Sequence, residues 1–461
     1  MKRLKQLLLL GLVCFMGFSS IKAQSDTIYK LSLSEAQEFA INNFFVSKNA
    51  QLDIESAQKK IWETTAIGLP QVSAGIDYTY MPDIPELSFP KVVMGANKGD
   101  NEPVYGGDFR DQNFYQTLPG EPFKMGVTNN VSYNLMLTQI IFSGEYIVGL
   151  QASKAYKSFA QENYEKVKIN IKEGIAGSYY ALLILEKNKI VLEETLENLK
   201  LSFEHTAKYF EQGLAEDTDV DQLELTVKRT ENSLRTLENQ IVYLSKLFNY
   251  QIGLEADVSV ELKDNIEELI SKNIIDAAAL SFNLTNHIDY KILLTQENLQ
   301  NLSYKREKSL FLPSVAGFYK YNDQFEQPDF NTNIKHILGV NVSIPILSSG
   351  MRLAKVGQAK IELDKASNMK DQEAQYLIIA SQQAQFDYST SLENYLNEKQ
   401  NFELSERVYK KTTAKFKEGM VSALDLSLIN NQFLQAQLSL TGAIQKLLSA
   451  KTNLDKAFNQ L

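Results

Sequence analysis

Three aspartates at alternate positions, Asp217, Asp219 and Asp221, are the densest group of possible metal ligands in the sequence. This spacing is typical of the start of a calcium-binding EF-hand loop, in which carboxylates at the first, third and fifth positions coordinate the ion. Such a loop also needs a glycine at its sixth position and a bidentate glutamate at its twelfth. Those two positions hold Gln222 and Lys228. We therefore expect no metal site here.

The other residues suited to catalysis are scattered along the chain. The three histidines, His205, His287 and His336, fall on an expected helix, a helix start and a strand entry. The only cysteine, Cys14, lies in a segment that we expect to be removed. The sequence has no nucleophile elbow, no HExxH motif and no GxGxxG motif. We therefore expect neither an enzyme nor a bound cofactor.

The N-terminus has the pattern of a secretory signal peptide. Basic residues close to Met1 precede an apolar run, Leu7–Phe18, and small residues follow it before Gln24. A membrane anchor is the alternative, but the run is too short to span a bilayer. We predict that residues 1–23 are a signal peptide and that the mature chain has no thiol and no lipid anchor.

Composition narrows the class of protein further. The net charge of −9 and the pI near 5.2 disfavour a nucleic-acid partner, which calls for a basic surface. The 10 Pro and 22 Gly are unevenly placed, so long tracts contain neither residue. Such tracts, rich in Glu, Lys, Gln, Ala and Leu, favour long helices.

One glycine-containing stretch occurs twice, as KYFEQGLAEDTDV (residues 208–220) and AKFKEGMVSALDL (residues 414–426). A glycine suits a helix C-terminus, where the backbone enters left-handed space. An aspartate six residues later suits the first turn of a returning helix, near the positive end of its dipole. Ser422 and Asp425 have the spacing of a capping box. The pairs that match at one common offset are Phe210 with Phe416, Gly213 with Gly419, and Asp219 with Asp425.

The duplication extends over the whole mature chain. Asn43 precedes Pro70 by the same number of residues as Asn286 precedes Pro313. The main difference is one loop of the first half, residues 81–126, which is longer and rich in turn residues. We therefore predict two structural repeats, joined by a linker. Their expected bounds are 24–252 for the first repeat, 253–285 for the linker and 286–461 for the second repeat.

Within each repeat the hydrophobic period changes from that of a helix to that of a strand. Helices are expected over 32–68 and 286–311, capped by Ser34 or Asn286, and each ends at a Leu-Pro pair. Alternation of apolar and polar residues then predicts strands. After Gly144 and Gly350 about 65 residues lead to the glycine turn, which as a helix would be ~100 Å long. The strands are expected at 71–80, 131–138, 314–321 and 339–346, and the returning helices at 219–250 and 425–458.

Each chain thus offers four strands of a length that crosses a bilayer when tilted. Their two faces suit lipid on one side and water on the other. Four strands cannot close a barrel, and unpaired edges in lipid are costly. The chain would therefore share strands with copies of itself, as a dimer of eight strands or a trimer of twelve. The alternative from the pattern alone is an ordinary half-buried hairpin pair in a soluble protein.

The ordered series of motifs resembles the TolC-like outer-membrane efflux proteins. The motifs are LSLSEAQEFAINN (31–43), the two LPxV strand entries (69–72 and 312–315), IFSG (141–144) with PILSSG (345–350), and the two FxxGxxxxxD turns. The resemblance implies a mixed α and β membrane protein. It implies a homotrimer with a 12-stranded β-barrel in the outer membrane, continued by a long α-helical barrel in the periplasm. By the same likeness, residues 253–285 contribute to an equatorial belt.

The resemblance also implies a role for the glycine turns. In the family they form the periplasmic tip, and an acidic residue at the position of Asp425 faces the closed pore. Asp425 and Asp219 are therefore the expected pore constriction. Leu428 replaces a second acidic residue of well-known members, and Phe416 and Val421 replace a tyrosine and an arginine that hold the tip closed. Closure by Phe210 and Phe416 is then expected instead, and the tip turns would comprise Gly213, Gly419, Phe210, Phe416, Thr218 and Ser422.

These inferences together predict an exported outer-membrane channel of a tripartite efflux pump or a type I secretion system. It would be a passive exit duct that works with a periplasmic adaptor protein and an inner-membrane transporter, since no motif in this sequence binds nucleotide. The alternative is a secreted helical coiled-coil scaffold or adhesin without a pore. Lipid-facing tyrosines in the predicted strands favour the channel, because a scaffold has no need of them.

Overall fold

The structure is a computed structural model, and it describes residues 28–89, 91–94, 115–118, 120–328, 331 and 333–461. The predicted signal peptide, with Cys14, lies outside these residues. The chain divides into two compact units. Unit 1 comprises residues 1–52, 162–291 and 373–461, and unit 2 comprises residues 53–161 and 292–372.

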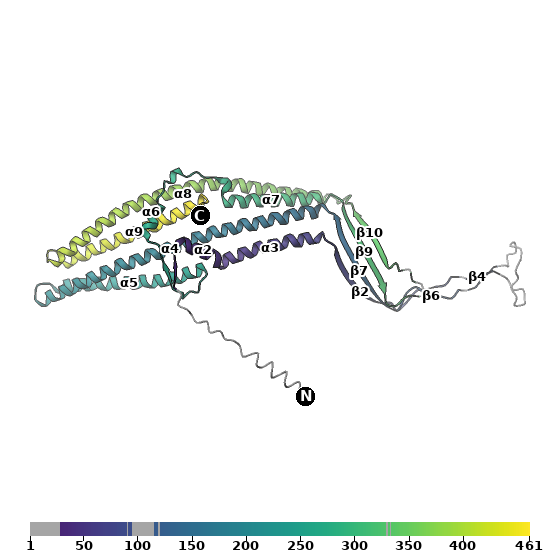
Figure 1. Cartoon of the computed structure of the whole chain (residues 1–461), viewed down its shortest axis with the longest axis horizontal. Helices are drawn as coiled ribbons and strands as arrows, with labels where there is room; N and C mark the ends of the chain where they lie inside the picture. The colour runs from purple at the N-terminus through teal and green to yellow at the C-terminus, as the bar shows by residue number, and fades with distance from the viewer. Residues whose placement is uncertain (1–27, 90, 95–114, 119, 329–330, 332) are drawn as a thin grey trace, which may run out of the picture. The chain divides into compact units, whose positions relative to one another are not determined.

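Unit 2 contains a four-stranded antiparallel sheet in the order β10-β9-β7-β2 (Figure 1). The pairing of β7 with β9 joins the two hairpins, β2–β7 and β9–β10, into one sheet. The edge strands of this sheet are β2 and β10. The strands are β2 (Gln71–Tyr80), β7 (Asn129–Phe142), β9 (Ser314–Gln324) and β10 (His336–Ser343).

The two faces of this sheet differ in polarity. Cross-strand pairs place Val72 with Leu137, Ile76 with Tyr133, and Tyr319 with Leu338 on one apolar face. The other face carries polar pairs such as Asp77 with Ser132 and Thr79 with Asn130. The apolar face is exposed in the single chain: Ile76 is 76% exposed and Leu338 82%. A sheet in water would bury such a face.

The predicted strands match the strands of this sheet, except that the last strand is displaced along the sequence. The strand predicted at 71–80 coincides with β2, and β7 and β9 are longer than predicted. The strand predicted at 339–346 is displaced, because β10 runs from His336 to Ser343. Pro345 has no backbone N–H to donate to a ladder, so the alternation of side chains continues past the last residue that can pair.

The long loop of the first half is more regular than its turn residues indicate. Its described parts form two short antiparallel pairs. The turn-rich loop predicted at 81–126 thus also contains short strands. The pairs are β3 (Glu86–Leu87) with β6 (Phe123–Lys124) and β4 (Lys91–Met94) with β5 (Tyr115–Leu118).

Helices lead into and out of the sheet in the same order in both halves. A helix precedes each first strand, and a very long helix follows each second strand, as predicted. The preceding helices are α3 (Phe45–Ile67) and α7 (Ile288–Ser309). The long helices are α4 (Gly144–Glu211) and α8 (Met351–Lys417), and each returns through a shorter helix, α5 (Asp217–Ile252) or α9 (Ala423–Ala457).

Unit 1 holds the main apolar core, formed by the inward faces of these helices. Leu447, Leu448 and Leu454 of α9 are fully buried, with Tyr179 of α4 and Phe248 of α5 in the same cluster. The helix α5 packs against α9 here, and α6 (Ile266–Asn273) also contacts α9. Burial of these apolar side chains stabilises the unit.

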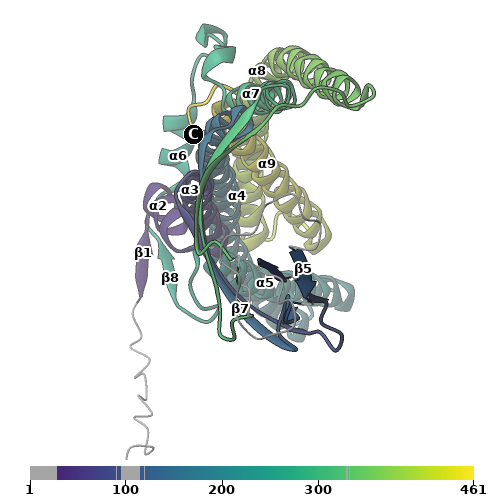
Figure 2. The same ribbon diagram turned by 90° about the vertical axis from the view of Figure 1, so that its right-hand side faces the viewer.

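The linker predicted at 253–285 contributes one strand of a parallel pair. Strand β1 (Tyr29–Leu31) pairs with β8 (Val260–Leu262), and Figure 2 shows them side by side. The Tyr179 hydroxyl donates to Asp264 Oδ2 at 2.8 Å, and that same oxygen accepts from the Leu33 backbone N–H at 2.7 Å. The start of the described chain is thus tied to the linker.

The helix predicted over 32–68 is interrupted. It consists of α2 (Leu33–Asn43) and α3, with an extended backbone at Phe44 between them. The N-cap of α2 is Ser32, which forms a full capping box with Glu35, and not Ser34. Asn286 does not cap α7, because it lies in the 3₁₀ helix η2 (Leu284–Asn286). A second 3₁₀ helix is η1 (Ala277–Ala279).

The described part of the chain is mostly helical. Among the residues that the structure describes, no helix is both long and apolar enough to cross a membrane.

Candidate functional site

The two glycine turns of unit 1 have the same backbone structure. Gly213 and Gly419 have φ angles of 74° and 70°, in the left-handed region that glycine adopts at little cost. The Gly213 N–H donates to Phe210 O, and the Gly419 N–H donates to Phe416 O, both at 2.9 Å. In each turn the next N–H donates five residues back. The repeated sequence therefore encodes the same helix ending twice.

The helices that follow these turns begin differently. In α9 the N-cap is Ser422, whose Oγ accepts from the Asp425 backbone N–H at 3.1 Å and donates to Asp425 Oδ2 at 2.8 Å. In α5 the N-cap is Glu216, and its side chain makes no cap hydrogen bond. The predicted pairing of Ser422 with Asp425 is confirmed, although the carboxylate accepts from the serine hydroxyl and not from its backbone N–H.

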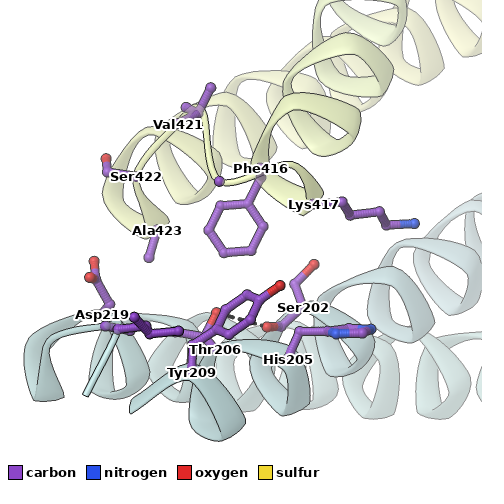
Figure 3. A pocket seen from close by; sticks show the side chains of 13 residues that line it. Ser202, His205, Thr206, Tyr209, Asp219, Phe416, Lys417, Val421, Ser422 and Ala423 are labelled. Carbon is purple, nitrogen blue, oxygen red and sulfur yellow. Dashed lines mark hydrogen bonds between the residues drawn. The ribbon is translucent and has the colours of Figure 1, made fainter. Parts of the chain in front are cut away.

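A cavity of about 340 Å³ lies between the two turns (Figure 3). The ring of Phe416 points from the α8–α9 side toward Tyr209 on the α4 side. Backbone and side chains of both turns complete the wall, so the two copies of the motif face one another. The lining residues are Ser202, His205, Thr206, Tyr209, Leu214, Ala215 and Asp219 from one turn, and Phe416, Lys417, Gly419, Val421, Ser422 and Ala423 from the other.

The predicted site residues divide into two groups. Asp219, Phe416, Gly419 and Ser422 line this cavity. The others lie outside its wall: Asp425 is exposed, Phe210 is 43% exposed, Gly213 has open space where a Cβ would lie, and the Thr218 hydroxyl donates to Glu216 Oε2 at 3.2 Å. Within one chain, Phe416 therefore faces Tyr209 and not Phe210.

A small apolar cluster with two stacked aromatic rings packs among the helices next to the two turns. Tyr409 and Phe433 stack with their ring centroids 4.8 Å apart, and Leu223, Ala423 and Leu426 are the other buried members of the cluster. Thr226 of α5 and Ser427 of α9 share a hydrogen bond of 3.1 Å. The positions of the two turns relative to each other are thus set by packing and by one buried polar contact.

Sequence reasoning missed Tyr209, His205 and Lys417 as members of this wall. Tyr209 precedes Phe210, and both fit the local helical pattern, so only the packing of the two hairpins decides which of them points into the cavity. His205 lies one turn before Tyr209, and that spacing was the available signal.

The cavity wall consists of polar, charged, aromatic and small side chains. Asp217 and Asp219 lie in the first turn of α5, not in a loop, so they do not form the calcium-binding geometry that their spacing suggests. Within the described ranges, no group of three or more His, Cys, Asp or Glu side chains is placed to hold a metal ion. Carboxylates lie in the first turns of α5 and α9, and Lys208, Lys415 and Lys417 lie in the last turns of α4 and α8.

Comparison with known proteins identifies relatives for most of the chain. The family described as outer membrane efflux protein matches residues 88–243 and 296–460. No curated protein matches the sequence.

Several solved structures share the fold at low sequence identity. The outer membrane protein VceC of Vibrio cholerae has a TM-score of 0.68 at 14% identity, covering 92% of this chain and 95% of that one. The CmeC outer membrane channel of Campylobacter jejuni also has a TM-score of 0.68, at 16% identity over 93% and 85%. The open state of the MtrE outer membrane channel of Neisseria gonorrhoeae scores 0.65 at 13% identity over 92% and 88%.

Proposed function

Since the chain belongs to the outer membrane efflux protein family, it is an outer-membrane efflux channel with its helical part in the periplasm, and we propose that three copies form the pore. The observation that carries this proposal is the exposed apolar face of the sheet in unit 2, on which Ile76, Leu338 and Val340 are each more than 60% exposed. In a bilayer that face contacts lipid, while the polar face lines water.

Closure of the barrel follows from the edges of the sheet. Strands β2 and β10 are edge strands, and unpaired backbone groups cost several kcal/mol each in hydrocarbon. Pairing β10 of one copy with β2 of the next satisfies both edges. Three chains of four strands then make the 12-stranded barrel, and the α4–α5 and α8–α9 hairpins continue it as a helical barrel.

The two halves of the chain would be structural repeats within each subunit, with bounds 24–252 and 286–461 and the linker 253–285 between them. The order of helix, strand, strand, long helix and returning helix is the same in both halves. The linker carries β8, which pairs with β1, and α6, which contacts α9, and both are suited to an equatorial belt.

The glycine turns would form the periplasmic entrance. Asp425, exposed at the start of α9, and Asp219, at the start of α5, would each occur three times around the axis. Such rings repel anions and attract cations. The facing pair of Phe416 and Tyr209 would take the place of the predicted pair of Phe210 and Phe416 as the apolar packing at the tip.

The channel would act as a passive duct with no catalytic step of its own. Its partners would be a periplasmic adaptor, an inner-membrane transporter that supplies the energy, and outer-membrane lipid. A scaffold or adhesin without a pore is not favoured, because it gives no account of the exposed apolar sheet face.

Cell fractionation followed by mass measurement of the detergent-extracted particle tests this proposal. We expect a trimer in the outer-membrane fraction that conducts ions in planar bilayers. A soluble periplasmic monomer would refute it.

A further inference from the structure

Helix α7 covers one face of α4 next to the sheet in unit 2. The Arg306 guanidinium forms an ion pair with Glu145. A Cβ added at Gly144 would come within 2.9 Å of Leu312 Cδ1 and 3.0 Å of Ser309 Cβ. This contact accompanies the pairing of β7 with β9, which places the start of α4 beside the end of α7.

Helix α8 follows β10 as α4 follows β7, but the equivalent face of α8 is bare. At matched positions after Gly144 and Gly350, residues of α4 are buried or half-buried where those of α8 are exposed. The differences follow a helical period, so they define one face. The covered residues of α4 are Gly144, Glu145, Val148, Gly149 and Ala152, and their exposed counterparts are Gly350, Met351, Ala354, Lys355 and Gln358.

Helix α3 leads into β2 as α7 leads into β9, and it too has a bare face. At positions matched through Pro70 and Pro313, α7 has residues that are buried or half-buried where those of α3 are exposed. Glu63 lies on the same face, at the position that corresponds to Arg306. The covered residues of α7 and the segment after it are Leu299, Leu302 and Leu310, and their exposed counterparts on α3 are Ser56, Lys59 and Ile67.

The helices that carry the two bare faces, α3 and α8, adjoin the two edge strands of the sheet, β2 and β10 (Figure 1). If β10 of one copy pairs with β2 of a second copy, α8 of the first lies along α3 of the second, as α4 lies along α7 within one chain. The helices run antiparallel in this arrangement. The occupant of each bare face is then a second copy of this chain.

Within one chain, the ion pair of Arg306 with Glu145 shows which residues of α7 and α4 lie opposite each other. The same register is expected for α3 and α8 of neighbouring copies. The counterparts of these two residues are Glu63 and Met351, which therefore lie opposite each other. Lys355 follows Met351 by one helical turn and Lys59 precedes Glu63 by one turn, so both ammonium groups lie within reach of the Glu63 carboxylate. In the single chain Glu63 pairs with Lys60 as an exposed i,i+3 pair, which contributes little to stability.

We infer that the α3 face formed by Ser56, Lys59, Glu63 and Ile67 docks on the α8 face of a neighbouring copy, with Glu63 opposite Met351 and paired with Lys355. This inference rests on the trimer proposed above. It adds the residues that determine which helices of two neighbouring copies pack together, and which residues lie opposite each other.

A charge-reversal experiment in the full-length protein tests the pairing. The wild-type oligomer is first confirmed by mass, and its dissociation into monomers in detergent is then followed over time at low salt. We expect Glu63→Lys to raise the dissociation rate about tenfold, because it leaves only ammonium groups at this point of three interfaces. The double variant Glu63→Lys/Lys355→Glu restores one opposite charge and should return to within about twofold of wild type.

Lys360→Glu, combined with Glu63→Lys, is the matched control because it changes the net charge by the same amount as Lys355→Glu. Lys360 pairs with Asp364 on a face of α8 that is exposed at the equivalent residue of α4 as well, so it should not slow dissociation. Circular dichroism shows whether each variant is folded. A double variant with Lys355→Glu that dissociates as fast as this control would overturn the pairing, while a wild type that is trimeric and conducts ions would leave the proposed function intact.

Crosslinking gives a second, independent measurement. The chain has one cysteine, Cys14, in the predicted signal peptide, so introduced thiols are specific. Glu63→Cys combined with Met351→Cys should give covalent dimers and trimers with a short thiol crosslinker. Monomers alone, from a preparation shown to be trimeric, would contradict the inference, and a monomeric wild type would overturn both this inference and the proposed trimer.

Discussion

Replacing Asp425 by Asn separates the electrostatic role of this residue from its structural one. The Ser422 hydroxyl donates to Asp425 Oδ2 at 2.8 Å, and an asparagine oxygen accepts the same hydrogen bond. The Asp425 backbone N–H still donates to Ser422 Oγ. Only the interaction of the carboxylate with the helix dipole is lost, at a cost of about 0.5 kcal/mol. The fold should therefore survive with a small change in melting temperature.

The effect on ions should be larger, because in the proposed trimer the substitution removes three charges. Three carboxylates at ~8 Å from a passing monovalent ion contribute about 0.5 kcal/mol each in the dielectric of water, or ~1.5 kcal/mol together. This energy corresponds to about a tenfold preference for cations. Screening weakens the effect in salt above roughly 0.1 M, so low ionic strength is the condition of choice.

Reversal potentials under a salt gradient in planar bilayers measure this preference. Wild type should favour cations, and Asp425→Asn should be clearly less selective, with weaker block by divalent cations added from the periplasmic side. Ser422→Ala is the matched control, since it removes the cap at a cost of about 1 kcal/mol while keeping the charge. It should lower the melting temperature and leave selectivity unchanged. If Asp425→Asn and Asp219→Asn both leave selectivity unchanged, the assignment of the pore ring is wrong.

Four further outcomes are expected. Gly419→Ala should lower stability by about 1 kcal/mol, measured by thermal unfolding, because its φ is +70° although the space around it is open. The Leu447→Ala variant should lose about 3 kcal/mol in denaturant unfolding, because this side chain is fully buried, and a loss below about 1 kcal/mol would contradict its place in the core. The pKa of Glu35 is held at about 2 by the Ser32 backbone N–H and the Lys263 ammonium, below the ordinary 4.5. The ionised Glu35 therefore stabilises the folded state above pH 4.5, and this contribution is lost as the pH falls toward 2. In an acid titration of unfolding, Glu35→Gln should lack this pH-dependent loss of stability. An epitope inserted near Gly99, which lies outside the described residues, should be labelled on intact cells. Loop 81–126 connects the two strands that we propose cross the membrane, at the end opposite the helices, and a loop tolerates added length. Labelling only after the outer membrane is opened would reverse this topology.

The sequence by itself determined the local elements whose ends are marked by proline or glycine. Leu69 with Pro70 ends a helix and begins β2 at the predicted residue, because proline stops a helix and the period of two then continues for ten residues. Gly213 and Gly419 were predictable as helix ends, because their left-handed backbone is a local requirement. The long helices were predictable in the same way, because their sequences contain no helix-breaking proline.

Only the tertiary structure decided features that depend on residues far apart in the chain. The break at Phe44 separates α2, which packs on α5, from α3, and no proline or glycine marks it. The parallel pairing of β1 with β8 joins segments more than two hundred residues apart. The choice of Tyr209 over Phe210 at the cavity depends on how the two hairpins pack, since both aromatic residues satisfy the local helical pattern. A periodic sequence defines which residues share a face, but the partner of that face is set by the packing of the whole chain.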